Sequence, residues 1–190
     1  MQTTIVVRKK RTHRDSGQAS NNNYFPDHPQ DCWPSDEEDI RSGNCSFHVD
    51  YLGRVELDAS ETRNPKACRD SFEKLHEEYT RGELHPPSAV LWITGYELRV
   101  VEKESKDLIL AQIIENVYFC SSTVERSKQF FYTSKDVHCD RWWCHLFIAK
   151  NDCSGDRLCR AVGIAFRECL RRKILRQGRS AVSHMNRCIG

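Results

Sequence analysis

The sequence predicts an α+β domain in which a seven-stranded antiparallel β-sandwich or barrel is capped by a C-terminal α-helix. Three observations support this fold class. Seven short segments with strand character follow one another with short connections. The segment after the first strand has helical periodicity, and so does the last long segment of the chain. Because that last helix has a broad apolar face, it needs a packing partner, and the sheet is the one available.

The first strand and the helix that follows it are expected between Cys45 and about position 80. In the strand Cys45–Leu57, apolar and polar residues alternate over positions 45–51, which is the period of a strand with one buried face. A helix follows, because Asn64 can cap its start and Pro65 suits its first position. This gives the fold a second helix directly after its first strand.

Six further strands and the capping helix complete the pattern. The expected strands are Ala89–Thr94, Glu97–Glu102, Leu108–Ala111, Ile114–Ser121, Gln129–Ser134 and Arg141–Ala149. From Asp156 to about Arg176, apolar residues recur with helical spacing, and either Ser154 or Asp156 can supply the N-cap. Many short strands at such close spacing are typical of an antiparallel sandwich or barrel.

Composition divides the chain into one domain and two tails. Residues 1–40 contain a basic run, then asparagines and prolines, then acidic residues, with no helical or strand period. We therefore expect a disordered N-terminal tail there. The domain is expected over residues 41–176, and residues 177–190 are expected to form a disordered C-terminal tail.

Charge and hydropathy exclude several classes of function. The net charge is +2, from 29 basic and 27 acidic residues, which gives no general argument for nucleic-acid binding. No apolar run approaches the roughly 20 residues that a membrane-spanning helix needs. The N-terminal residues lack the apolar core of a secretory signal, so we expect a cytoplasmic protein with reduced cysteines. We also expect a monomer without a nucleic-acid partner.

A cluster of cysteine and histidine residues is the strongest chemical motif, but its spacing does not favour a metal site. His138-Cys139 and Cys144-His145 lie within eight residues, yet the short ligand spacing of zinc sites is absent. We expect Cys144 to be packed and His145 to lie on the surface. The chain has no glycine-rich phosphate loop and no nucleophile motif. The sequence therefore predicts no catalytic residue, no metal and no cofactor, and the protein is not expected to be an enzyme.

Five motifs, in the same order and at nearly the same spacing, resemble the PTB domain of the Numb family of endocytic adaptors. They are CSFHVDYLGRVEL, AVLWITGYELRVVEKESKDLI, IIENVYFC, RWWCHLFIAK and RLCRAVGIAFRECLRRK. The resemblance covers about residues 33–176 and does not extend to the long C-terminal tail of that family. It implies a phosphotyrosine-binding (PTB/PID) domain with a pleckstrin-homology-like fold, which agrees with the strand count obtained from the residues.

The resemblance also implies a function. In such domains, a groove between the fifth strand and the capping helix binds peptides that carry an NPxY-like or NxxF-like motif. The peptide adds to the sheet as an extra antiparallel strand, a mode of recognition called β-augmentation. The resemblance therefore implies a non-catalytic adaptor for the tails of membrane proteins or for signalling proteins. It further implies a Numb-like role in endocytosis and Notch cell-fate signalling, with peripheral recruitment to the membrane.

The resemblance assigns the peptide-binding residues motif by motif. Backbone groups of the fifth strand are expected to pair with the ligand, namely those of Val117, Tyr118, Phe119, Cys120 and Ser121. On the capping helix, Phe166 is expected to face the groove and Leu170 to extend the same wall. Gly163 is expected to let the helix lie close to the sheet. From the residues alone, an aromatic such as Phe166 on an amphipathic helix is usually expected in the core.

This chain departs from the family pattern in the loop 122–129 and the hairpin 136–140, near the expected resting place of a tyrosine ring. Ligand preference and dependence on phosphate therefore stay open. The cationic side chains that can contact phosphate or lipid are Arg126, Lys128, Lys135, Arg171 and Arg172. Together with the basic run at 8–14, they support an alternative function as a module that binds phosphoinositides or another anionic membrane surface.

Overall fold

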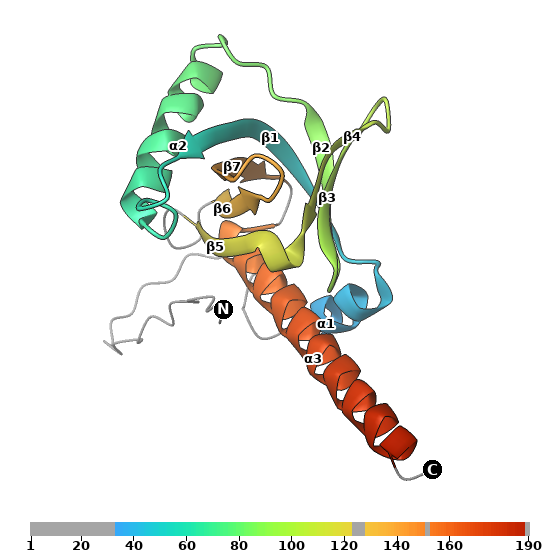
Figure 1. The fold of residues 1–190 in the computed structure, drawn as a ribbon. Helices are drawn as coiled ribbons and strands as arrows, with labels where there is room; N and C mark the ends of the chain where they lie inside the picture. The colour runs from blue at the N-terminus through green and yellow to red at the C-terminus, as the bar shows by residue number, and fades with distance from the viewer. Residues whose placement is uncertain (1–32, 123–127, 151–152, 189–190) are drawn as a thin grey trace, which may run out of the picture.

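The computed structural model describes residues 33–122, 128–150 and 153–188 (Figure 1). In chain order, its elements are α1 (Trp33–Ser42), β1 (Ser46–Leu57), α2 (Pro65–Thr80), β2 (Ser88–Ile93), β3 (Glu97–Glu102), β4 (Leu108–Ile113), the short 3-10 helix η1 (Ile114–Asn116), β5 (Val117–Ser122), β6 (Gln129–Asp136), β7 (Arg141–Ala149) and α3 (Gly155–Cys188).

The seven strands form one antiparallel sheet in the order β4-β3-β2-β1-β7-β6-β5, so β1 is central and β4 and β5 form the two margins. This arrangement confirms the predicted fold class, including the helix after the first strand and the helix at the C-terminal end. As predicted, Asn64 caps α2 by accepting a hydrogen bond of 3.0 Å from the Lys66 amide, and Pro65 is the first residue of that helix.

Strand β1 changes the face to which its apolar residues point. Its register with β7 shifts between Tyr51 and Gly53, and Gly53 has φ = +122°, a backbone conformation that residues with a Cβ avoid. Before the shift, Phe47 and Val49 belong to the core that α3 covers. After it, Leu57 belongs to a second core that α2 covers. β1 therefore joins two cores on opposite faces of the sheet.

Strand β6 shows why its sequence is a continuous apolar run. Phe130 and Tyr132 pack in the α3 core, while Phe131, between them, packs in the α2 core. All three side chains are fully buried. A strand covered on both faces carries apolar residues at successive positions. Figure 1 shows α2 and α3 on different sides of these strands.

Helix α1 corrects the predicted N-terminal boundary, which placed residues up to 40 in a disordered tail. Ile40 is fully buried in the α3 core. The Asp36 carboxylate, 2% exposed, accepts two hydrogen bonds from the Arg157 guanidinium at 3.1 and 2.7 Å. Such a planar, two-bond pair fixes α1 against α3. The sequence alone did not predict this helix, because its stabilising partner lies 121 residues away.

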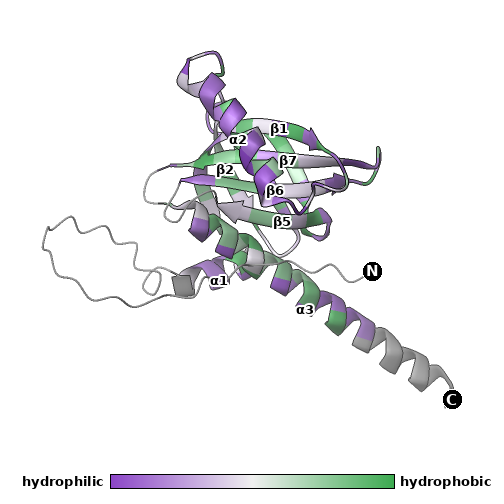
Figure 2. Ribbon diagram, turned by 90° about the vertical axis from the view of Figure 1, so that its left-hand side faces the viewer, coloured by the Kyte–Doolittle hydropathy of each residue, from purple (hydrophilic) through white to green (hydrophobic). Residues whose placement is uncertain are grey.

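Helix α3 corrects the C-terminal boundary, since it runs to Cys188 and not to about Arg176 as predicted. Residues 177–188 include no proline and several good helix formers, so nothing in them forces an end. At the other end, Ser154 acts as the cap, because its hydroxyl accepts a hydrogen bond of 3.2 Å from the Arg157 amide. Figure 2 shows α3 continuing well beyond the sheet.

Candidate functional site

Strand β5 is an edge strand of the sheet, here also called a margin. Within the described residues it pairs with β6 alone, so the backbone N–H and C=O groups of its other side have no partner strand. Helix α3 packs along the same strand (Figure 1). An edge strand of this kind offers a ready template for an added strand. The space between β5 and α3 is therefore a candidate groove for an extended peptide.

The predicted strand residues divide between the interior and the surface. Val117 and Cys120 are buried in the α3 core. Phe119 is half-buried on the α2 side, with its ring 6.0 Å from that of Phe131. Tyr118 lies at a register shift and is half-exposed, and Ser121 is half-exposed near the end of the strand. Side chains of β5 thus anchor the strand on both faces, which leaves its backbone as the surface for recognition.

Gly163, Phe166 and Leu170 share one face of α3. At about 100° per residue they fall within about 60° of one another around the helix. Phe166 is half-buried against the α3 core, while Leu170 is 49% exposed. Gly163 is half-exposed and presents no side chain. The three positions form an apolar wall with an open end, and Figure 2 shows hydrophobic residues along this part of α3.

Polar contacts at both ends hold α3 at a fixed distance from β5. At one end, the Ser122 hydroxyl donates to the Asp156 carboxylate. In the middle, the Cys120 thiol donates to the Cys159 carbonyl oxygen at 3.8 Å. At the other end, the Lys173 ammonium lies 2.7 Å from the Glu115 carboxylate in η1 and lowers its pKa. A groove braced in this way is preorganised for a ligand.

The cationic residues predicted to contact phosphate are not brought together. Arg126 lies outside the described residues. Lys128 precedes β6 and Lys135 lies near its other end, about 23 Å away at the usual rise per strand residue. Lys135 pairs with Asp140 at 2.5 Å, and this hydrogen bond raises the lysine pKa. In the sheet, Val117 at the start of β5 pairs with Ser134 near the end of β6. Lys135 therefore lies at the Val117 end of β5, whereas Lys128 lies at the opposite end of that strand.

An aromatic cluster at that end was missed in the sequence analysis. The rings of Tyr118 and Trp142 meet edge to face, with centroids 4.6 Å apart. The Lys135 ammonium lies 5.4 Å from the centroid of the Trp142 ring. The hairpin between β6 and β7 is adjacent, because Lys135 pairs with Trp142 in the sheet. The two tryptophans in RWWCHLFIA were a signal for this cluster, but their neighbours across the sheet were not readable from the sequence.

Arg171 and Arg172, the other predicted phosphate or lipid contacts, lie away from the Phe166 wall. They are about 140° and 240° from Phe166 around the helix. Arg171 donates to Glu168 at 3.0 Å. The Arg172 guanidinium stacks on the Tyr96 ring at 3.9 Å, above the backbone of Gly95.

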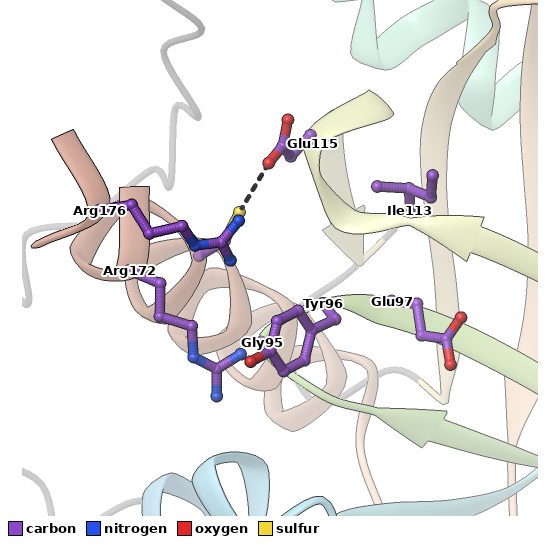
Figure 3. A pocket seen from close by; sticks show the side chains of 8 residues that line it. Gly95, Tyr96, Glu97, Ile113, Glu115, Arg172 and Arg176 are labelled. Atoms are coloured by element: carbon purple, nitrogen blue, oxygen red, sulfur yellow. Dashed lines mark hydrogen bonds between the residues drawn. The ribbon is translucent and has the colours of Figure 1, made fainter. Parts of the chain in front are cut away.

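Arg172 borders a shallow hollow between α3 and the β2–β3 turn (Figure 3). The hollow also contains the carboxylates of Glu97 and Glu115, and the second of these accepts a hydrogen bond from the Cys169 thiol at 3.6 Å. Glu97 is paired with Arg99 at 3.0 Å. The hollow therefore mixes both signs of charge and does not form an anion site like those of arginine clusters.

The cysteine and histidine cluster corrects one expectation and leaves no metal site among the described residues. Cys144 is buried, as expected, but His145 is buried too, at 1% exposure. Its ring nitrogens lie 3.1 Å from the Tyr51 hydroxyl and 3.1 Å from the Ser134 hydroxyl. Desolvation lowers its pKa to about 3, so the ring is neutral. His145 was misassigned because β7 is covered on both faces and does not alternate.

Comparison with known proteins identifies the fold's family. Residues 47–176 match the family model described as phosphotyrosine interaction domain (PTB/PID). The chain belongs to this family. The match includes both walls of the candidate groove, β5 and the first part of α3. Domains of this family are non-catalytic adaptors.

The relatives of this PTB/PID chain confirm the resemblance to the Numb family. It is 40% identical to the human protein numb homolog over 158 residues and 42% identical to the mouse Numb-like protein over 151 residues. It is 38% identical to Numb-related protein 1 of Caenorhabditis elegans over 150 residues. These alignments cover 78–80% of this chain but 24% of each relative. The chain thus spans about a quarter of the length of these relatives.

A solved structure supports the fold independently. The C-terminal phosphotyrosine interaction domain of mouse APBB2 superposes with a TM-score of 0.54. The superposition covers 66% of this chain and 85% of that domain, at 19% sequence identity. At this identity the likeness concerns the fold alone. It agrees with the single antiparallel sheet and the C-terminal helix described above.

Proposed function

We propose that this PTB/PID domain is a non-catalytic adaptor that binds NPxY-like or NxxF-like peptides of membrane-protein tails along β5. The observation that carries the proposal is the free edge of β5 beside the apolar wall of α3. Backbone hydrogen bonds give a peptide affinity with little sequence demand, and side-chain pockets then give specificity. Phe166 and Leu170 are the side chains proposed to contact an apolar ligand residue.

Binding is proposed not to require a phosphate on the ligand. Lys135, the predicted phosphate contact at the Val117 end of β5, is already paired with Asp140. A phosphate would have to compete with that carboxylate, whereas a neutral tyrosine or phenylalanine ring can pack against the Tyr118 and Trp142 rings without displacing a charge. We therefore expect phosphorylated and unphosphorylated peptides to bind with similar affinity.

The test is a titration of labelled NPxY and NxxF peptides, with and without tyrosine phosphate, against wild type, Phe166→Arg and Leu175→Arg. Leu175 is the matched control, because it is 50% exposed and lies about 180° from Phe166 around α3. Loss of an aromatic anchor costs about 2 kcal/mol or more, so Phe166→Arg should weaken binding at least ~30-fold. Equal affinity of the two arginine variants would contradict the site, and no binding by folded wild type would contradict the function.

The wider cellular role is proposed from the relatives. Similarity to Numb, Numb-like and Numb-related proteins extends the proposal to endocytic adaptor function, Notch cell-fate signalling and recruitment to the membrane surface from the cytoplasm. Among the described helices, none combines the length and hydropathy that crossing a bilayer requires. Because the alignments cover 24% of each relative, their partners are carried over only as proposals.

A second candidate function is binding of an anionic membrane surface by α3. Its support is a group of exposed cations on that helix, Arg167, Arg171 and Lys173, together with exposed Ile174 and Leu175. Basic residues near an anionic lipid surface contribute about 1 kcal/mol each. Sedimentation with vesicles containing phosphoinositide should then show binding that weakens steeply with added salt. Binding that salt leaves unchanged would remove this candidate.

A further inference from the structure

The N-terminal part of the chain contains a copy of the motif that the groove is proposed to bind. Asn22-Asn23-Tyr24-Phe25 reads as NxxF, and Asn21 and Tyr24 have the spacing of an NPxY-like motif without its proline. We call residues 21–25 the internal motif. It lies outside the described residues and ends eight positions before α1 begins at Trp33. A possible ligand and its groove therefore belong to the same chain.

Two other NxxF sequences in the chain cannot serve as ligands. One is residues 44–47, in which Phe47 is 5% exposed and packs in the α3 core. The other is residues 116–119, which run into β5 itself, with Phe119 half-buried on the α2 side. Strand residues that are already paired in the sheet have their backbone groups engaged. Of the three NxxF sequences, only the internal motif lies outside these paired strands of the described residues.

The position of α1 brings the internal motif within reach of the groove. Asp36 of α1 accepts two hydrogen bonds from Arg157, in the first turn of α3. Phe166 lies nine residues further along α3, about 14 Å by the helical rise, and about 180° around a helix that is 10–12 Å across. Eight residues of extended chain span up to about 26 Å. The connection to Trp33 is therefore long enough to place the internal motif beside Phe166.

The direction of the chain fits as well. A strand added antiparallel to β5 has its N-terminal end beside Ser122 and its C-terminal end beside Val117. Ser122 bonds to Asp156 at the start of α3, whereas Glu115, just before β5, pairs with Lys173 further along that helix. The C-terminal end of a bound motif thus lies level with the middle of this stretch of α3. From there the chain can return toward α1.

The connecting segment also matches the charge of the helix face that it has to cross. Residues 26–32 read PDHPQDC, with two aspartates and no lysine or arginine. Between Phe166 and Arg157 around α3 lie Arg167 and Arg171, at about 100° and 140° from Phe166. Their side chains are 65% and 54% exposed. Opposite charges along this path favour the crossing.

We propose that the internal motif occupies the β5–α3 groove of its own chain and competes there with peptides of other proteins. The proposal rests on the proposed peptide-binding function and adds a regulation of that same site. A motif on a short connection acts at an effective concentration of about 1 mM. For a motif whose own dissociation constant is about 100 μM, an external peptide then binds roughly tenfold more weakly, because most grooves are already filled.

The test is a titration of the full chain and of Tyr24→Ala/Phe25→Ala with the labelled NPxY peptide. The double variant removes both overlapping motifs and should bind about tenfold more tightly than wild type. Ile5→Ala/Val6→Ala, a similar loss of apolar side chains in the same N-terminal segment, should bind as wild type. A synthetic peptide of residues 18–29 should bind the double variant, and adding Phe166→Arg should abolish this binding.

The outcomes separate the two proposals. Equal affinity of wild type and Tyr24→Ala/Phe25→Ala for the labelled peptide would overturn self-occupancy and leave the peptide groove intact. If the double variant is folded by circular dichroism and binds no peptide, the proposed function itself is contradicted. Sedimentation equilibrium should keep wild type at 22.2 kDa. A mass that rises with concentration in wild type, but not in the double variant, would overturn occupancy within one chain in favour of exchange between copies.

Discussion

The two margins of the sheet, β5 and β4, begin from the same backbone chemistry and differ in what surrounds them. β5 has α3 packed along it, so any added strand must also fit the wall formed by Phe166 and Leu170. β4 has an uncharged sequence and exposed side chains at both ends, and at its Ile113 end it lines a hollow with the charged α3 residues Arg172 and Arg176. An edge with an apolar wall beside it can select a partner by side chains, whereas an edge without one offers mainly its backbone hydrogen-bonding groups.

Hydrogen exchange gives the largest expected effect and tests the margins directly. The Ile114 amide donates to a carbonyl of the β2–β3 turn, so by the alternation of antiparallel ladders the amides of Ala111 and Ile113 point away from β3. In dilute protein, the outward amides of Ala111 and Ile113 should exchange more than about a hundredfold faster than those of Leu110 and Gln112, which bond to β3. Adding peptide should protect amides of β5 and leave the two outward amides of β4 as they were. Slow exchange of Ala111 in dilute protein would mean that the β4 margin is not free.

Removal of the Asp36 carboxylate should have the next largest effect, because it leaves the Arg157 charge without its two-bond partner. Breaking a buried ion pair costs about 3 kcal/mol. Asp36→Ala should lower the free energy of unfolding by about that amount in denaturant titrations, and should also weaken peptide binding. Glu38→Ala, an exposed change on the same helix, should stay within about 0.5 kcal/mol. Similar losses in both variants would show that α1 does not hold α3.

Substitutions at two glycines test the bend at Gly53 in β1, the central strand of the sheet. Gly53→Ala forces a Cβ into φ = +122° and should cost about 1–3 kcal/mol in unfolding free energy. At Gly95, a new Cβ would lie 2.7 Å from the guanidinium of Arg172, which can move, and 3.1 Å from the Cβ of Glu168, so α3 would have to shift by a few tenths of an ångström. Gly95→Ala should therefore cost about 1 kcal/mol, less than Gly53→Ala. The reverse order would mean that the β1 bend tolerates a side chain.

The smallest effect concerns pH. Burial opposes ionisation of Glu168, but hydrogen bonds from Arg171 and Arg41 outweigh it and hold the pKa of Glu168 below its usual 4.5. A lowered folded-state pKa stabilises the protein above the unfolded pKa, and this contribution is lost as pH falls through the folded value. Melting temperature should therefore drop more below about pH 4.5 in wild type than in Glu168→Gln. Parallel curves would contradict this role of Glu168.

Local patterns predicted most of the fold. Strand alternation in β1, the Asn64 cap and the helical spacing after Ser154 are properties of neighbouring residues, and each of these elements begins within one residue of the expected position. Resemblance, and not periodicity, supplied the roles of β5 and Phe166. Their placement beside each other agrees with that assignment, while a role in binding stays a prediction.

Long-range relations were beyond the sequence. Helix α1 is fixed by Arg157, and burial of His145 depends on strands that cover both of its faces. That β4 is a margin follows from the strand order, which no local pattern contains. The Tyr118–Trp142 contact likewise joins residues 24 positions apart whose pairing the sheet decides.

The ion pair between Asp36 and Arg157 has a practical consequence for the choice of N-terminal boundary when a fragment of this protein is expressed. A fragment starting at residue 41, the boundary that composition suggests, would lose the carboxylate and keep a guanidinium resting 5.2 Å from the Phe47 ring centroid. Such a fragment would expose the side of α3 that α1 covers and would be prone to precipitation during purification. A fragment that begins at or before Trp33 keeps the Asp36–Arg157 ion pair and should be the more soluble of the two.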